Sequence, residues 1–373
     1  MGGTGLDTLA RRVGAIMAGA IGRGCMPGGV VLAWSDGQVL LHEAYGNAVL
    51  WKDGETRLEE PVPATTATIY DCASLSKLFT ATCVMRLVER GAVELDSPAA
   101  RYAPGFGSNG KAAITVRQLL AHVGGLRSGI QLWRVDESPA RRLERALSIA
   151  PDHPPGTFFL YSDMGAIALG AVAERAGGRT LDRQVADDVA GPLGMADTGY
   201  RPDVALLPRI AATEYQPHEA GRDMVRGTVH DENSWSLGGV AGHAGLFSTA
   251  ADLLRFARCH LNGGTLDGIT ILQPETAREM QTLQTGYLLS GARRGLGWEL
   301  DQQYYMGKLR APTTFGHTGF TGTSLVMAPS SRAIVVLLCN RVHPTRNGPP
   351  FNPVREAVAD AVAEAIGVAP SGS

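Results

Sequence analysis

The sequence comprises 373 residues, of which 44% are hydrophobic and 19% are charged, with a formal net charge of −2. A chain of this length and balance can bury a sizeable core, and we expect a globular protein with two lobes. It carries no basic stripe, which argues against nucleic acid as a partner. No apolar run reaches the roughly 18 residues that suggest a membrane span, so no membrane association is expected.

Near the N-terminus, Arg11 and Arg12 precede the apolar stretch 13–21. A signal peptide has a similar order, but Gly14 and Gly19 interrupt this stretch, Gly22 follows it, and there is no convincing cleavage site before the first strand. We therefore expect an amphipathic first helix. The five cysteines are odd in number and scattered, with no C-x-x-C pair, which argues against a disulfide framework and a zinc site. Reduced thiols and the lack of an export signal favour a cytoplasmic enzyme.

The first predicted strands, residues 29–34 and 39–42, flank Ser35-Asp36-Gly37. An Asp-Gly pair between two apolar runs is typical of a β-hairpin. The middle of the chain is rich in helical patterns, and we predict helices over residues 115–122, 136–149, 163–176 and 180–189. Gly177-Gly178 ends the third of these helices.

Near the other end, residues 323–327 and 333–339 flank Pro329-Ser330-Ser331 and predict a second hairpin. The second strand of this hairpin is apolar on both faces, which is typical of a central, covered strand. Asn352 and Pro353 then supply an N-cap and a proline at the first helical position. A helix is expected from there to about residue 366.

Strands near both termini with helices between them predict an α+β fold. One antiparallel sheet would be built from both ends of the chain and flanked by N- and C-terminal helices, with a mostly helical lobe inserted. We expect a discontinuous sheet lobe, residues 1–65 and 290–373, and a helical lobe, residues 66–289. The active site would lie in the cleft between them.

The candidate chemistry begins at Ser74-Leu75-Ser76-Lys77, whose spacing puts the Ser74 hydroxyl and the Lys77 ammonium on one helical face. A serine is a poor nucleophile until a base takes its proton. Lysine can be that base only if burial or charged neighbours lower its pKa. Ser74 lies at or near a helix N-terminus, where N–H groups and the dipole favour a developing anion. Alternatively, Ser74 is merely an N-cap.

Tyr161-Ser162-Asp163 directly precedes one of the predicted helices. A tyrosine beside a lysine can be ionised far below its usual pKa of about 10 and act as a general base. The alternative interpretation is a core tyrosine with Ser162 or Asp163 capping the helix.

The segment Phe315-Gly-His-Thr-Gly-Phe-Thr-Gly322 is the third candidate motif. Small residues around His317, Thr318 and Gly319 would let a strand edge approach a substrate closely. The N–H of Phe320 could then pair with the N–H of Ser74 as an oxyanion hole. His317 at the pocket wall could steer protons or bind an anionic group. The alternative is a simple glycine-rich turn.

His230, Asp231 and His243 can be read as metal ligands, but adjacent residues in a loop cannot all point at one ion. We prefer a glycine-rich loop, residues 238–245, that shapes the pocket. No metal or organic cofactor is therefore expected. Cys72 lies two residues before Ser74, and its apolar neighbours favour a buried structural thiol over a nucleophile.

Together these motifs resemble the serine β-lactamase and penicillin-binding-protein superfamily, nearest to its class C-like branch with the CubicO group and β-lactamase-like carboxylesterases. The resemblance runs from about residue 25 to 345 and includes the blocks 114–126, 239–248 and 340–346. It implies Ser74 as the nucleophile, Lys77 as its activating lysine and Tyr161 as the general base. It also implies that residues 317–319 match the Lys-Thr-Gly strand motif.

Two positions depart from this pattern. Asp163 stands where class C β-lactamases usually have asparagine, so an acceptor replaces an amide that could donate to a substrate carbonyl. His317 stands where lysine is usual, and histidine is often neutral at pH 7. Both changes weaken the recognition of an anionic β-lactam.

We therefore expect a serine hydrolase, a carboxylesterase or amidase, that acts on a small-molecule ester, amide or β-lactam-like substrate through an acyl-serine. A transacylase of secondary metabolism, which passes the acyl group to an amine, is the first alternative, and a β-lactamase or D,D-peptidase is another. The lack of an export signal disfavours a cell-wall D,D-peptidase. The alternative without turnover is a penicillin-recognising sensor that stays acylated.

Overall fold

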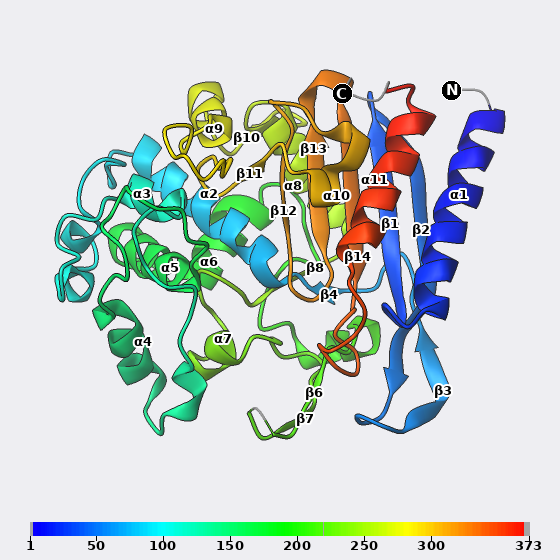
Figure 1. Ribbon diagram of the computed structural model, residues 1–373, viewed down its shortest axis with the longest axis horizontal. Coiled ribbons are helices and arrows are strands. Elements are labelled where there is room, and N and C mark those ends of the chain that lie inside the picture. The colour runs from blue at the N-terminus through cyan, green and yellow to red at the C-terminus, as the bar shows by residue number, and fades with distance from the viewer. Residues whose placement is uncertain (1–2, 219, 369–373) are drawn as a thin grey trace.

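A seven-stranded antiparallel sheet organises the computed structural model, which describes residues 3–218 and 220–368 (Figure 1). In sheet order the strands are β11 (Glu299–Leu300), β12 (Phe315–Thr318), β13 (Ser324–Ala328), β14 (Ala333–Cys339), β1 (Gly28–Ser35), β2 (Gln38–Trp51) and β3 (Arg57–Pro63). Both ends of the chain build this sheet, as the α+β prediction required.

The two predicted hairpins are present. Ser35 pairs with Gln38, so Asp36 and Gly37 form the turn, and both have positive φ, 45° and 89°. That is the conformation in which Asp-Gly matches the twist of the flanking strands. In the second hairpin, β14 lies between β13 and β1 and is buried along its whole length, which confirms the prediction of a central, covered strand.

The alternation of side chains along β14 sends residues to two cores. Val335 and Leu337 pack in a cluster with the helices α1 (Gly3–Gly22) and α11 (Asn352–Ala365). Val336 and Leu338 pack in the larger cluster on the opposite face, where α8 (Ala250–Leu261) contacts β1, β13 and β14. Figure 1 shows α1 and α11 side by side over one face of the sheet.

The chain between its two ends forms most of the remaining helices. They are α2 (Ser76–Glu89), α3 (Val116–Leu120), α4 (Pro139–Ser148), α5 (Asp163–Gly177), α6 (Leu181–Val185), α7 (Glu232–Ser236) and α9 (Pro274–Gln281), with α10 (Gln303–Met306) following β11. Short strands accompany them: β4 (Tyr70–Asp71), β5 (Gly199–Tyr200), β6 (Tyr215–Gln216), β7 (Arg222–Met224), β8 (Leu246–Ser248), β9 (Thr265–Leu266) and β10 (Ile269–Thr270).

The four helices predicted in this region are all present, and α3 to α5 lie within a few residues of their expected bounds. The helix α5 closes at Gly178, whose φ of 65° is the left-handed conformation typical of a glycine C-cap. The fourth predicted helix is α-helical only to Val185 and continues as a π-helical turn over residues 186–190. The predicted C-terminal helix is also confirmed as α11, but its start differs: Asn352 is the first helical residue rather than the N-cap, which is Phe351 without a side-chain cap bond, and Pro353 is the second helical residue.

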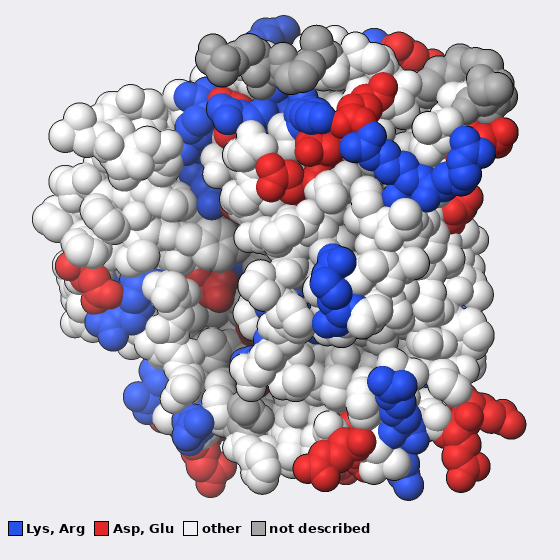
Figure 2. All heavy atoms as spheres, turned by 45° about the vertical axis from the view of Figure 1, so that its right-hand side comes forward, with Lys and Arg blue, Asp and Glu red and all other residues white. Residues whose placement is uncertain are grey.

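All five cysteines are buried and free. Within residues 3–218 and 220–368, no helix has the length and apolarity needed to cross a membrane. On the face drawn in Figure 2, acidic and basic side chains are interspersed, in keeping with the near-zero net charge of the sequence.

Candidate active site

Ser74 lies in a 3-10 turn, η1 (Ala73–Leu75), that joins strand β4 to helix α2. The buried carboxylate of Asp71 accepts hydrogen bonds from the N–H of Ala73 at 2.8 Å and of His230 at 2.7 Å. Ala73 has a φ of 47°, so the chain bends sharply just before the serine. Neither η1 nor α2 has a side-chain N-cap, so the interpretation of Ser74 as a helix cap is wrong.

Lys77, on the first turn of α2, is only 4% exposed, and its ammonium contacts several polar groups. Its Nζ donates to Ser74 Oγ at 2.8 Å and to the His243 carbonyl at 3.2 Å. It also forms an ion pair with Asp163 Oδ1 at 2.8 Å and lies 4.8 Å from the centre of the Tyr161 ring. Three segments that are distant in sequence therefore meet at this ammonium.

Tyr161 precedes α5, and its oxygen accepts a hydrogen bond from the Lys77 ammonium and is also a hydrogen-bond partner of Ser74. Ser162 is the N-cap of α5, because its Oγ accepts from the N–H of Gly165 at 3.0 Å. Both interpretations of this motif therefore apply: Ser162 caps the helix α5, and the phenol of Tyr161 lies in the candidate site. Ser74, Lys77 and Tyr161 converge, as the resemblance implied.

The protonation state of this cluster differs from the sequence-based expectation. Burial alone would lower the pKa of Lys77, but the carboxylate of Asp163 and the oxygen of Tyr161 together raise it above the usual value. Burial also raises the pKa of Tyr161, and the nearby Lys77 ammonium offsets this only in part. At neutral pH the resting site therefore holds a lysine ammonium and a neutral phenol, neither of which is a free base.

His317 is held in its neutral form by its surroundings. It lies on β12 and is almost fully buried, and this burial lowers its pKa to about 4. Its Nδ1 donates to the Thr318 carbonyl at 2.7 Å, since a carbonyl can only accept, and Nε2 has no partner among the described residues. A neutral imidazole that presents a lone pair cannot attract an anionic group by charge, in keeping with the expectation that histidine at this position weakens the recognition of an anionic substrate.

The turn after β12 packs directly on the segment that carries Ser74. Thr321 Oγ1 donates to the Asp71 carbonyl at 2.8 Å, and Thr323 Oγ1 donates to the Cys72 carbonyl at 3.1 Å. A Cβ on Gly319 would collide with Thr323 Oγ1 and with the Cys72 carbonyl. Gly319 thus permits a close approach to the segment before Ser74, whereas the close approach of a substrate stays a prediction.

These residues border a cleft of about 720 Å³. The predicted residues Ser74, Tyr161, Asp163 and 317–320 line it, and Lys77 lies beneath its floor. Its wall also contains charged and aromatic residues that sequence reasoning missed: Arg294, Glu299, Tyr304, Arg341, Arg346, Phe351 and Arg355. Arg341 and Arg346 fall in the block 340–346 that was noted for its resemblance, whereas Arg294, Glu299 and Arg355 gave no local signal.

The family model for β-lactamases matches residues 9–359 of the chain. The chain belongs to the β-lactamase family. An Escherichia coli (strain K12) protein described as a "Putative D-alanyl-D-alanine carboxypeptidase" is 33% identical over 357 residues, covering 87% of this chain and 80% of that protein. The family and this relative support a serine hydrolase of the acyl-transfer type in general terms.

Solved structures agree with the family assignment. EstCE1, described as a hydrolase with promiscuous acyltransferase activity, has a TM-score of 0.75 and 24% identity, with 96% of this chain and 99% of that chain covered. A class C β-lactamase has a TM-score of 0.75 and 19% identity, with 96% and 98% covered. Both likenesses establish the β-lactamase-like fold and confirm the predicted fold class, and the match to the family model confirms the predicted superfamily.

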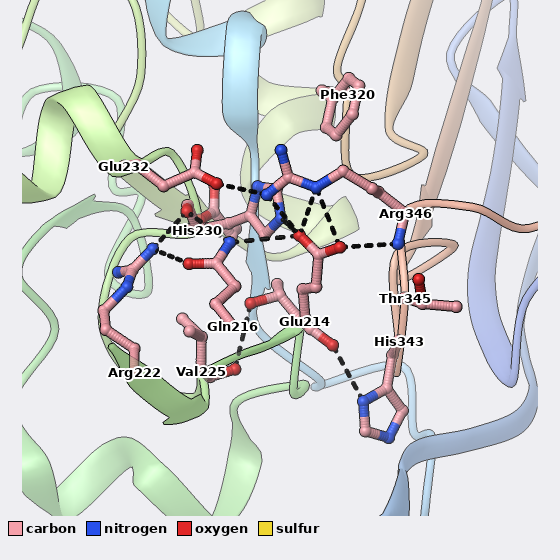
Figure 3. A network of polar contacts seen from close by, with 12 residues as sticks. Glu214, Gln216, Arg222, Val225, His230, Glu232, Phe320, His343, Thr345 and Arg346 are labelled. Carbon is pink, nitrogen blue, oxygen red and sulfur yellow. Dashed lines mark hydrogen bonds and ion pairs between the residues drawn. The ribbon is translucent and has the colours of Figure 1, made fainter. Parts of the chain in front are cut away.

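In this family member, a buried ionic network supports one wall of the cleft (Figure 3). The carboxylate of Glu214 contacts His230 Nε2 at 2.8 Å and accepts from Arg346 Nε at 2.9 Å, and Arg346 also pairs with Glu232. Burial opposes ionisation of Glu214, but the bonds from His230 and Arg346 prevail and lower its pKa to about 2. The His230 ring stacks on Phe320, with ring centres 5.7 Å apart.

The glycine-rich loop 238–245 shapes the cleft floor, as predicted. Its backbone carbonyls at Gly242 and His243 accept from Thr80 Oγ1 at 2.9 Å and Lys77 Nζ at 3.2 Å. The His243 ring bonds to Asp231 at 2.7 Å, whereas His230 bonds to Glu214, so the two histidines face different partners. Across the described residues, no three His, Cys, Asp or Glu side chains are grouped to hold a metal ion.

Proposed function

We propose that this protein is a serine hydrolase that cleaves a small-molecule ester or amide through an acyl-serine intermediate. The observation that carries the proposal is the contact of one buried lysine with Ser74 Oγ at 2.8 Å, beside a phenol bonded to both residues. Such a cluster can move a proton away from a serine hydroxyl and later return it to a leaving group. We also propose a sheet lobe, residues 1–65 and 290–373, and a helical lobe, residues 66–289.

The proton balance decides how the base would form. With Lys77 as an ammonium and Tyr161 as a phenol, the pair has to lose one proton before it can accept one. The pair's deprotonated form takes the Ser74 proton on the Tyr161 oxygen while Ser74 Oγ attacks the carbonyl carbon. Tyr161 then gives that proton to the leaving group, and water releases the acyl group by the reverse transfers.

The oxyanion of the tetrahedral intermediate would be held by the N–H groups of Ser74 and Phe320. Within residues 3–218 and 220–368, neither N–H donates to an acceptor of the protein, and both residues line the cleft. A free, fixed donor of this kind contributes roughly 3–4 kcal/mol to a transition state. Asp163, held by Lys77, is assigned to the electrostatics of the cluster rather than to donation toward a substrate.

A second candidate is hydrolysis of a peptide that ends in D-alanyl-D-alanine. It is favoured by the description of the relative that is 33% identical. Transfer of the acyl group to an amine instead of water is the third candidate, because the same acyl-serine would serve both reactions. The three candidates share the nucleophile and differ in the acyl donor or acceptor.

The test is a panel of p-nitrophenyl esters, nitrocefin and a D-Ala-D-Ala peptide, each assayed with and without an added amine. We expect ester turnover with release of the free acid, and no acceleration by the amine. Acceleration together with an amide product would identify a transacylase. Preferred cleavage of the peptide would identify a carboxypeptidase. Mass spectrometry after rapid quenching should find the acyl group on the tryptic peptide that contains Ser74.

Replacing the nucleophile tests the mechanism itself. Ser74→Ala should lower turnover of the best ester by about 10⁴-fold or more, because loss of the nucleophile removes the covalent route. Ser108→Ala, at an exposed serine outside the cleft, is the control and should keep full activity. Turnover that survives Ser74→Ala would contradict the proposal. A permanent adduct on Ser74 without product release would point to a sensor.

A further inference from the structure

Arg355 is a buried cation on helix α11, far along the chain from Ser74, and only 7% exposed. Among the described residues, no carboxylate forms an ion pair with Arg355, and its Nε has no hydrogen-bond partner. Nη1 donates to Asn352 Oδ1 at 2.6 Å, and Nη2 donates to the carbonyls of Gly319 at 2.6 Å and Thr323 at 3.1 Å. Burying a guanidinium costs free energy. Here its Nη2 donates to the turn between β12 and β13, which forms part of the cleft wall.

The bond to Gly319 acts on a particular peptide unit. The Gly319 carbonyl and the Phe320 N–H belong to the same trans peptide, in which C=O and N–H point in opposite directions. A donor that holds this carbonyl toward α11 therefore turns the N–H to the opposite side of the peptide. A positive charge at the oxygen also polarises the unit and strengthens its N–H as a donor.

Several other polar groups of the turn have partners. The Phe320 carbonyl accepts from Arg341 Nε at 2.8 Å. The N–H of Gly319 donates to the Thr323 carbonyl at 2.8 Å, and the N–H of Gly322 donates to the Gly319 carbonyl at 3.1 Å. The Phe320 N–H, which has no acceptor among the described residues, is left available next to Ser74 at the cleft.

We propose that Arg355 is a positioning residue that orients and polarises the Gly319–Phe320 peptide, so that the Phe320 N–H stabilises the oxyanion. The inference rests on the proposed acyl-serine mechanism and adds to it a group from the C-terminal helix. A purely structural role, in which Arg355 only ties α11 to the sheet, is the competing explanation. If Arg355 positions the peptide, replacing it weakens the stabilisation of the transition state in an enzyme that is still folded. If its role is purely structural, a folded variant keeps that stabilisation.

The experiment compares Arg355→Met and Arg355→Lys with the wild-type protein on its best p-nitrophenyl ester. Loss of one oxyanion donor lowers kcat by about 10²–10³-fold. Losing the Arg355 side chain that orients this donor should therefore lower kcat by about 10-fold or more, with little change in KM. The inhibition constant of phenylboronic acid, which forms a tetrahedral adduct on serine, should rise by a similar factor. Added guanidinium should restore part of the kcat of Arg355→Ala.

Arg12→Met is the matched control, since Arg12 ties α1 to Glu364 of α11 without touching the turn, and its kinetics should be unchanged. A folded Arg355→Met enzyme with wild-type kcat, or one whose kcat falls while boronate binding stays constant, would overturn the inference. If Arg355→Met fails to fold, the same comparison on Arg355→Lys decides. Wild-type protein that neither turns over an ester nor binds the boronate would instead contradict the proposed function.

Discussion

Lys77 and Asp163 form a charge pair beside Ser74, the proposed nucleophile. In the resemblance to class C β-lactamases, Asp163 replaces an asparagine and was interpreted as a loss for substrate recognition. The structure gives this carboxylate a different task, because it lies 2.8 Å from Lys77 Nζ. There it raises the pKa of both Lys77 and Tyr161 and so favours the protonated form of each.

This pairing predicts the pH dependence of catalysis. Because the active form lacks one proton on the Lys77–Tyr161 pair, kcat/KM should rise with pH on the alkaline side of neutrality. Asp163→Asn removes the anion that raises both pKa values, so the rise should move to lower pH. Asp163→Glu keeps the charge and serves as the control. Full pH–rate profiles of the three proteins check this, and an unmoved profile in Asp163→Asn would refute it.

At the scale of elements, the reactive geometry depends on the turn between β12 and β13 resting on η1. Thr321 and Thr323 donate to the two carbonyls just before Ala73, so the turn and the nucleophile share one hydrogen-bonded unit. Gly319 permits this contact because any side chain would meet Thr323 and the Cys72 carbonyl. The spacing between Ser74 and the Phe320 N–H is therefore set by backbone packing.

Gly319→Ala should disturb this unit without unfolding the protein. The added methyl would push the turn away from η1, at a cost of about 1–3 kcal/mol for overpacking. We expect a fall in kcat of about 100-fold, as for a lost oxyanion donor. Gly129→Ala is the control, since nothing lies within 4 Å of its Cβ position. Ester kinetics with thermal unfolding check the prediction, and a fully active Gly319→Ala protein would contradict it.

At the scale of the whole molecule, the Glu214 network joins the inserted helical region to the C-terminal segment. Glu214 comes from the chain just before β6, His230 from the loop before α7 and Arg346 from the loop before α11. Figure 3 shows them beneath Phe320, so the same bonds support the cleft wall. Because the carboxylate of Glu214 is buried at this junction, the free energy of unfolding depends on the residues that pair with it.

Arg346→Met should lower the free energy of unfolding by about 3 kcal/mol, because Glu214 would lose its cation. In the wild type, the pKa of Glu214 is lowered from 4.5 to about 2, so its contribution is present above pH 4.5 and is lost as pH falls through about 2. Urea unfolding between pH 7 and pH 3 measures both effects. Arg332→Met, which breaks an exposed pair with Asp36, should cost less than about 1 kcal/mol. Equal losses in the two variants would contradict the prediction.

The elements that the sequence predicted well are those whose signals are local. The Asp36-Gly37 turn, the apolar β14 and the helix near Asn352-Pro353 each depend on a few adjacent residues, and all three are present, although the N-cap of that helix is Phe351 and not Asn352. The sequence predicts one α-helix after Thr180, but this helix ends as a π-helical turn. The spacing of apolar residues does not distinguish the wider π-helical turn from an α-helical one. Convergence of Ser74, Lys77 and Tyr161 was predictable because the motif order is that of a known superfamily.

The sequence by itself therefore determined the sheet built from both chain ends, the family and the candidate reacting groups. Only the tertiary structure decided their protonation and their support. The pKa of Lys77 depends on Asp163, the neutrality of His317 depends on burial, and Arg355 reaches Gly319 from another element. Electrostatic energies depend on distances through space and on exclusion of water, and neither quantity follows from the separation of residues along a chain.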